Sequence, residues 1–152
     1  MINGERTFVV DEPFIVGTMI GLGADLPKTA IDFLLFHWRF SGYHCWRMLI
    51  KVFFSPEWPI NLHQWIIGAF LDLVMSGAFG VGLVYFMRLL GPGYFWMKGI
   101  AYSLGTWVFV CLIASGHWFG NSLEVYHSFI NHQIWGAVAV YWLFSLKRGW
   151  LK

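Results

Sequence analysis

The stretch GLGADLPKTAIDFLLFHW, residues 21–38, places two carboxylates, an ammonium and a proline in a segment that is otherwise apolar enough to cross a membrane. At the helical spacing of about 100° per residue, Asp25, Lys28 and Asp32 fall on one face. An ionisable side chain at the centre of a bilayer costs about 3 kcal/mol or more, so such groups turn towards protein or water. The sequence therefore predicts that this face packs against other helices.

The same face carries small residues as well as charges. Gly17 and Gly21 form a GxxxG pair in GTMIG, the spacing at which two transmembrane helices approach closely. Glycines in the other apolar stretches are interpreted as packing positions in the same way, namely Gly68, Gly99 and Gly136. Two independent preferences thus select one buried face for the first helix.

The composition is that of a membrane protein. Of the 152 residues, 58% are hydrophobic and 12% are charged, whereas soluble domains average roughly 45–50% apolar and 25% charged residues. Apolar stretches predict membrane spans at about residues 14–38, 61–88, 98–118 and 126–146, and an aromatic, basic segment predicts a short interfacial helix at about 41–54. We therefore expect a single all-α integral membrane domain, 1–152, with four transmembrane helices in an up-down bundle.

The distribution of lysine and arginine favours an orientation with both termini in the cytoplasm. An inside N-terminus places these basic residues on the cytoplasmic side: Arg6, Arg88, Lys98, Lys147, Arg148 and Lys152. It leaves Arg39, Arg47 and Lys51 outside. The N-terminus lacks the basic start and small-residue cleavage site of a signal peptide, so we expect the first span to be retained.

The intramembrane charges have two interpretations. Lys28 is three residues from Asp25 and four from Asp32, so these side chains are predicted to form an ion-pair ladder along their own helix. Asp72 lies in the second span without a local cation, which makes its carboxyl the better candidate for titration unless Lys28 reaches it. The cluster of Asp25, Lys28, Asp32 and Asp72 either holds the bundle together or supports ion or proton movement.

An up-down path brings all six histidines towards one side of the membrane. Glu124 and His127 are spaced as E-x-x-H, which presents two metal ligands on one helix face, and paired histidines near one membrane face are able to ligate haem b. The candidate ligands for a metal ion or a haem are His63, His117, Glu124, His127 and His132. The same residues can also be explained by structural roles, such as hydrogen bonds to headgroups or loop carbonyls. No cofactor is therefore predicted.

Other classes of function are disfavoured. The net charge of +2 and the scattered basic residues do not make a nucleic-acid surface. The sequence contains no nucleophile elbow, phosphate loop or nicotinamide fingerprint. Cys45 and Cys111 form no CxxC metal motif and are not expected to pair. We therefore expect a non-enzymatic membrane component that is surrounded by the lipid bilayer and assembles as a homo-oligomer or as a subunit of a larger membrane complex.

Three segments carry a family resemblance. They are GTMIGLGADLPKTAIDF (17–33), MKGIAYSLGTWVFV (97–110) and INHQIWGAVAVYWL (130–143). Together with the four-helix layout, they resemble the small four-helix bacterial membrane proteins of the YqhR and YagU type. The resemblance implies a location in a bacterial cytoplasmic membrane and transfers no catalytic residue.

Overall fold

The computed structural model describes residues 12–40, 42, 44–54, 61–91, 93–113 and 122–146. In this part of the chain there are five helices and no strand. The helices are α1 (Pro13–His37), α2 (Cys45–Phe53), α3 (Leu62–Leu90), α4 (Phe95–Ile113) and α5 (Ser122–Leu146). The predicted all-α fold is confirmed for the described residues.

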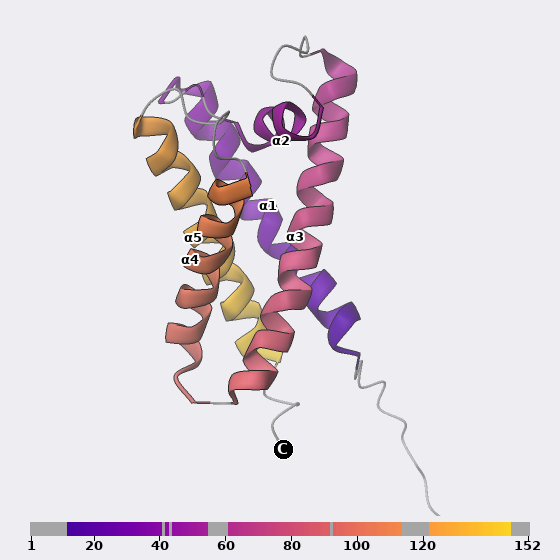
Figure 1. Ribbon diagram of the computed structural model, residues 1–152, viewed down its shortest axis with the longest axis vertical. Helices are drawn as coiled ribbons and strands as arrows, with labels where there is room; N and C mark the ends of the chain where they lie inside the picture. The colour runs from indigo at the N-terminus through magenta and orange to yellow at the C-terminus, as the bar shows by residue number, and fades with distance from the viewer. Residues whose placement is uncertain are drawn as a thin grey trace, which may run out of the picture.

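The four long helices run alternately up and down, and the short helix α2 lies across the upper end of the bundle (Figure 1). The inclined helix α1 contacts α3 and α5, while α4 packs mainly on α5. The end of α1, the start of α3 and the start of α5 lie at the same upper end of the bundle as α2 (Figure 1). This is the order of directions that the sequence predicts.

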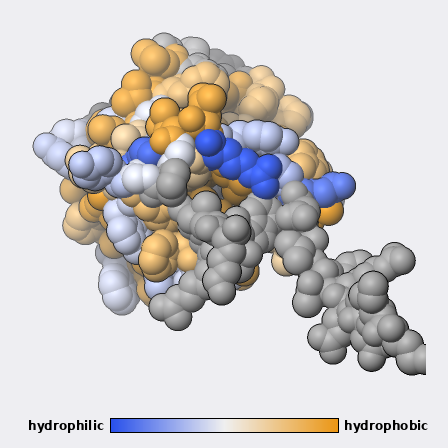
Figure 2. Space-filling view, turned by 90° about the horizontal axis from the view of Figure 1, so that it is seen from below, coloured by the Kyte–Doolittle hydropathy of each residue, from blue (hydrophilic) through white to orange (hydrophobic). Residues whose placement is uncertain are grey.

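Three helices are long and apolar enough to cross a membrane, namely Pro13–His37, Leu62–Leu90 and Phe95–Leu112. Their flanks expose large apolar side chains such as Phe14, Phe70 and Phe109, and hydrophobic residues cover much of the surface seen from below (Figure 2). The helix α5 has 25 residues but is not one of the three. The fourth span thus stays a prediction, and residues 114–118 of the third predicted span lie outside the described residues.

The crossing of α1 and α3 is closest where glycines of the two helices meet. A Cβ atom at Gly17 would collide with backbone atoms of Gly80 and Val81, and one at Gly21 would collide with the backbone of Ser76. Gly80 has no room for a side chain either, because the backbone of Gly17 and Gly21 lies against it. The two backbones touch, and this contact brings the charged residues of α1 directly against α3.

The glycines predicted to pack on the other helices also lie at helix contacts. A side chain at Gly99 of α4 would meet Val140 of α5, and one at Gly136 of α5 would meet Ser103 of α4. The Ser103 hydroxyl also donates a hydrogen bond to the backbone oxygen of His132 at 2.7 Å. The α4–α5 seam is therefore held by small residues and a polar contact, as expected inside a membrane.

The short helix α2 packs with one face on the end of the bundle. The Cβ position of Gly68 in α3 lies 2.6 Å from the backbone oxygen of Trp46, so α2 rests directly on α3. Met48 and Ile50 are buried on the packed side, whereas Arg47 is exposed. The helix predicted at about 41–54 is thus present at Cys45–Phe53.

The lower half of the bundle is filled by an apolar core. Its buried members are Val16, Ile20, Ala24, Leu83, Val84, Met87, Phe95, Trp135, Ala139, Val140 and Leu143. At the lower end, Lys98 donates to the backbone oxygens of Leu90 and Gly91 at 2.7 and 2.9 Å, which satisfies carbonyls at the end of α3. In the part of the chain that the structure describes, the buried charges lie above this core, in the upper half of the bundle.

Candidate functional site

Buried polar and charged side chains fill the upper half of the bundle beneath α2. We call this group the upper cluster, and its members are Asp25, Lys28, Asp32, His44, Cys45, Asp72, His127 and Asn131. They come from α1, α3, α5 and the N-terminus of α2, and each is less than a tenth exposed. Such burial is costly unless each charge lies close to a compensating group.

The ammonium of Lys28 is the centre of one half of the upper cluster. Its Nζ lies 2.6 Å from Asp25 Oδ1 and 2.6 and 2.7 Å from the two carboxylate oxygens of Asp72 on α3. The hydroxyl of Ser76 donates to Asp25 Oδ1 at 2.7 Å, and Trp46 Nε1 donates to Asp72 Oδ2 at 3.1 Å. Thr29 also donates to Asp25 at 3.4 Å and Cys45 to Asp72 at 3.3 Å, so each of the two carboxylates binds the same ammonium and two neutral donors.

This arrangement decides one open alternative about the charges and corrects one prediction. Asp72 has no cation on its own stretch of helix, but Lys28 reaches it across the α1–α3 interface. The predicted ladder along α1 is wrong at its upper end, because Lys28 pairs with Asp25 and Asp72 while Asp32 binds other groups. Spacing along one helix cannot show either result, since both depend on how α1 is placed against its neighbours.

The carboxylate of Asp32 is the centre of the other half. Its Oδ1 accepts a hydrogen bond from Asn131 Nδ2 at 2.6 Å and lies 3.1 Å from His127 Nε2, both on α5. Its Oδ2 accepts from the backbone N–H of Cys45 at 3.0 Å and lies 3.3 Å from His44 Nδ1. This one side chain therefore joins α1 to α5 and to the N-terminus of α2, where the helix dipole favours an anion.

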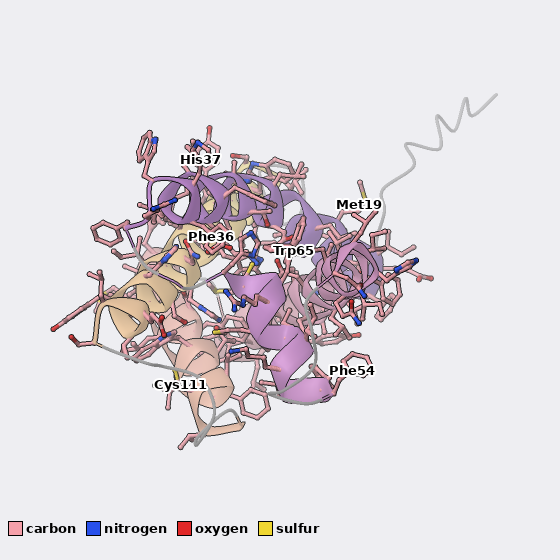
Figure 3. All side chains as sticks on the ribbon, turned by 90° about the horizontal axis from the view of Figure 1, so that it is seen from above. Met19, Phe36, His37, Phe54, Trp65 and Cys111 are labelled. Carbon is pink, nitrogen blue, oxygen red and sulfur yellow. The ribbon has the colours of Figure 1, made fainter. Side chains whose placement is uncertain are left out.

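The imidazole of His44 lies in an aromatic cage. Its ring centroid is 4.5 to 5.4 Å from those of four edge-on rings, which are Phe33, Phe36, Trp46 and Trp65. Figure 3 shows Phe36 and Trp65 near the middle of the upper end, beside α2, whereas His37 lies on the outer side of α1. Burial lowers the pKa of His44, and the Asp32 carboxylate acts in the opposite direction. The cage holds the ring with Nδ1 towards Asp32.

The thiol of Cys45 links the two halves of the upper cluster. Its Sγ donates to Asp72 Oδ2 at 3.3 Å, while its backbone N–H binds Asp32. Burial raises the pKa of this thiol well above its usual range, although the Lys28 ammonium acts in the opposite direction. Asp32, His44 and Cys45 each offer one ligand atom, and these three atoms lie within 4.8 Å of one another.

Of the predicted metal or haem ligands that lie in the described part of the chain, His127 belongs to the upper cluster. His63 is exposed at the start of α3, and His117 lies outside the described residues. His132 is half-buried, with Nδ1 3.0 Å from a carbonyl oxygen of its own helix. Glu124 is half-buried, and its Oε1 lies 3.1 Å from the Cβ position of Gly42. A metal ion or a haem bound by these residues stays a prediction.

The E-x-x-H motif contributes to the upper cluster in a different way from the one predicted. His127 and Asn131 both approach the carboxylate of Asp32, while Glu124 is not part of the three-residue donor group. The sequence prediction of ligands also missed His44 and Cys45. In the sequence, His44 and Cys45 are marked only by being adjacent to each other at the start of an amphipathic helix. This pattern indicates a site only when the structure shows that Asp32 lies beside them.

The protein is helical, and three of its helices are long and apolar enough to cross a membrane. One half of its helical bundle contains a buried cluster of charged side chains. No protein family, curated protein or solved structure matches the chain. The function therefore has to be inferred from the upper cluster and its surroundings.

Proposed function

We propose that the protein is a non-enzymatic, multi-pass membrane component with four transmembrane helices, in which the upper cluster holds α1, α3 and α5 together. The observation that carries the proposal is the double pairing of Lys28, whose ammonium binds Asp25 on its own helix and Asp72 on α3. Removing one partner of a buried ion pair leaves an uncompensated charge and costs about 3–5 kcal/mol. A pairing of this kind selects one placement of α1 against α3.

The helix α5 is proposed as the fourth span. Its 25 residues extend for about 37 Å at 1.5 Å per residue, which exceeds a hydrocarbon thickness of about 30 Å. Its polar residues His127, Ser128 and Asn131 are buried, whereas Ile130 and Phe144 are exposed. The polar groups of α5 therefore face the other helices, and apolar groups remain available for lipid.

Ion or proton movement across a single chain is less well supported than assembly. The upper cluster occupies only the upper half of the bundle, and the apolar core fills the lower half. The fully buried Ala24, next to Asp25 on α1, belongs to this core. An ion that left the cluster downwards would have to cross packed apolar side chains at a high cost in free energy. We therefore propose that the upper cluster stabilises the bundle and does not carry ions across the membrane.

The proposed location is a bacterial cytoplasmic membrane, with both termini in the cytoplasm. The start of α1, the α3–α4 connection and the end of α5 lie at the lower end of the bundle (Figure 1). Arg88 and Lys98 flank that connection, so the positive-inside tendency favours a cytoplasmic lower end. The resemblance to the YqhR and YagU type supports the same location. The exposed apolar flanks favour lipid as a partner, and a homo-oligomer or a larger membrane complex remains part of the proposal.

The proposal is tested by thermal unfolding of the detergent-solubilised protein. Lys28→Met is expected to lower the midpoint strongly, because Asp25 and Asp72 then stay buried without their ammonium. Lys51→Met is the matched control, since it removes a half-buried lysine of α2 that is not a member of the upper cluster. Equal midpoints for the two variants would contradict the assembly role.

A further inference from the structure

We propose that Asp32, His44 and Cys45 form a binding site for one divalent transition-metal ion of the zinc class. The three residues offer a carboxylate oxygen, an imidazole nitrogen and a sulfur, and all three are buried. Zinc is bound in proteins by these three ligand types, usually with four ligands, whereas calcium and magnesium take oxygen ligands. The mixed donor set therefore favours zinc or a chemically similar ion, and it leaves one position for water or a further ligand.

The distances are close to those that a metal site requires. The three ligand atoms lie within 4.8 Å of one another. Around a tetrahedral zinc ion with bonds of about 2.0–2.3 Å, ligand atoms are roughly 3.3–3.8 Å apart. An inward movement of the side chains by about 1 Å is therefore enough to close the site.

The fold holds the three residues together before any ion binds. His44 and Cys45 are consecutive at the N-terminus of α2, and the backbone N–H of Cys45 donates to Asp32 Oδ2 at 3.0 Å. This hydrogen bond ties the N-terminus of α2 to the upper part of α1. The site therefore does not depend on a chance approach of distant side chains.

The other oxygen of Asp32 is oriented by α5. Asn131 Nδ2 donates to Oδ1 at 2.6 Å, and His127 Nε2 lies 3.1 Å from the same atom. Metal-binding carboxylates and imidazoles are commonly held in place by outer hydrogen bonds of this type. These contacts leave Oδ2 facing His44 and Cys45.

The hydrogen bonding of His44 supplies an independent argument. Its Nδ1 accepts from the backbone N–H of Trp46 at 3.3 Å and also lies 3.3 Å from Asp32 Oδ2. The single lone pair of Nδ1 serves either this hydrogen bond or a metal ion, so an ion bound at Nδ1 would take the place of the Trp46 contact, beside Asp32 Oδ2. In addition, His44 Nε2 and Asn131 Oδ1 have no hydrogen-bond partner among the described residues, which fits a cluster built around a further group.

The charge of the upper cluster also favours a cation. Its three carboxylates and one ammonium give a formal charge of −2 when both histidines are neutral. The divalent ion would bond to the sulfur as the S–H bond breaks, and the proton would leave to solvent, with no change in oxidation state. The exchange adds one net positive charge to the buried cluster, so binding reduces the unbalanced charge.

The site is tested with the full-length protein in detergent after removal of bound metal by a chelator. Cobalt(II) is the probe, because a thiolate ligand gives it a charge-transfer absorption band in the near ultraviolet. We expect saturation at one cobalt per chain, displacement by zinc, and loss of the band in Cys45→Ser. Cys111→Ser is the matched control, since Cys111 lies on α4 (Figure 3) outside the donor group and the band should persist.

The inference is overturned if the wild-type protein gives no saturable band, if the band survives Cys45→Ser, or if Cys111→Ser abolishes it. His44→Gln provides a second test that keeps the thiol, and it is expected to weaken cobalt binding at least tenfold. An unchanged affinity in that variant contradicts the site even if Cys45→Ser does not fold. The assembly role is measured separately, by thermal unfolding of the metal-free protein, so either idea can fail without the other.

Discussion

The ammonium of Lys28 in α1 lies 2.6 and 2.7 Å from the two carboxylate oxygens of Asp72 in α3, 44 residues further along the chain. Both side chains are almost fully buried. The contact joins two helices that are each long and apolar enough to cross a membrane. It explains why a lysine is tolerated in the middle of an apolar segment, since the lysine is compensated by protein groups and not by water.

The glycine contacts between α1 and α3 are expected to be essential for this pairing. Gly80→Ala should lower the free energy of unfolding by about 1–3 kcal/mol or more, because the new methyl group meets the backbone of Gly17 and Gly21. The measurement is unfolding in mixed detergent micelles. Gly105→Ala on α4 is the control, since nothing lies within 4 Å of its Cβ position. A Gly80→Ala variant as stable as Gly105→Ala would show that the close approach is not needed.

Proteoliposomes are expected to show no transport of protons by the chain. The apolar core below the upper cluster separates the buried charges from the lower side of the membrane. A pH gradient should therefore decay at the same rate with wild-type protein, with Asp72→Asn and with empty vesicles. A decay that the wild type accelerates and Asp72→Asn does not would contradict this expectation and support ion movement as the function.

The proposed metal site and the E-x-x-H motif predict different effects of two substitutions on α5. Asn131→Leu removes a hydrogen bond to Asp32, so cobalt affinity should fall about 10–100-fold. Glu124→Gln should leave the affinity unchanged, because Glu124 is outside the donor group. Cobalt titration of both variants provides the measurement. A loss of affinity with Glu124→Gln alone would assign metal binding to the E-x-x-H motif instead.

Much of the fold could be predicted because it follows from the length of the apolar stretches and from the spacing of small and charged residues along the sequence. Apolar stretches of span length located the long helices, and the shared spacing of Gly21, Asp25 and Lys28 identified the buried face of α1. The fourth span could not be established in this way. The polar residues of α5 are buried against its neighbours, but they weaken the apolar signal of the whole helix.

The candidate site was predictable only in part, because its contacts are between elements. Periodicity places Asp32 and Lys28 on the same face, but it cannot show that Lys28 binds Asp72 while Asp32 binds groups of α2 and α5. Those choices depend on the α1–α3 crossing and on the path that returns α2 over the bundle. For the same reason, nothing in their local sequence marks His44 and Cys45 as neighbours of Asp32.

The most direct measurement for the central claim is a double-mutant cycle on Lys28 and Asp72, read as the free energy of unfolding in mixed micelles. Lys28→Met should destabilise the protein by about 3–5 kcal/mol, because it leaves Asp25 and Asp72 buried without their ammonium. Asp72→Leu should cost less, because Lys28 keeps Asp25 as a partner. The double variant should be more stable than the sum of the two losses by about 2–3 kcal/mol. Losses that add within about 0.5 kcal/mol would mean that the two groups do not stabilise each other, and the account of the upper cluster would be wrong.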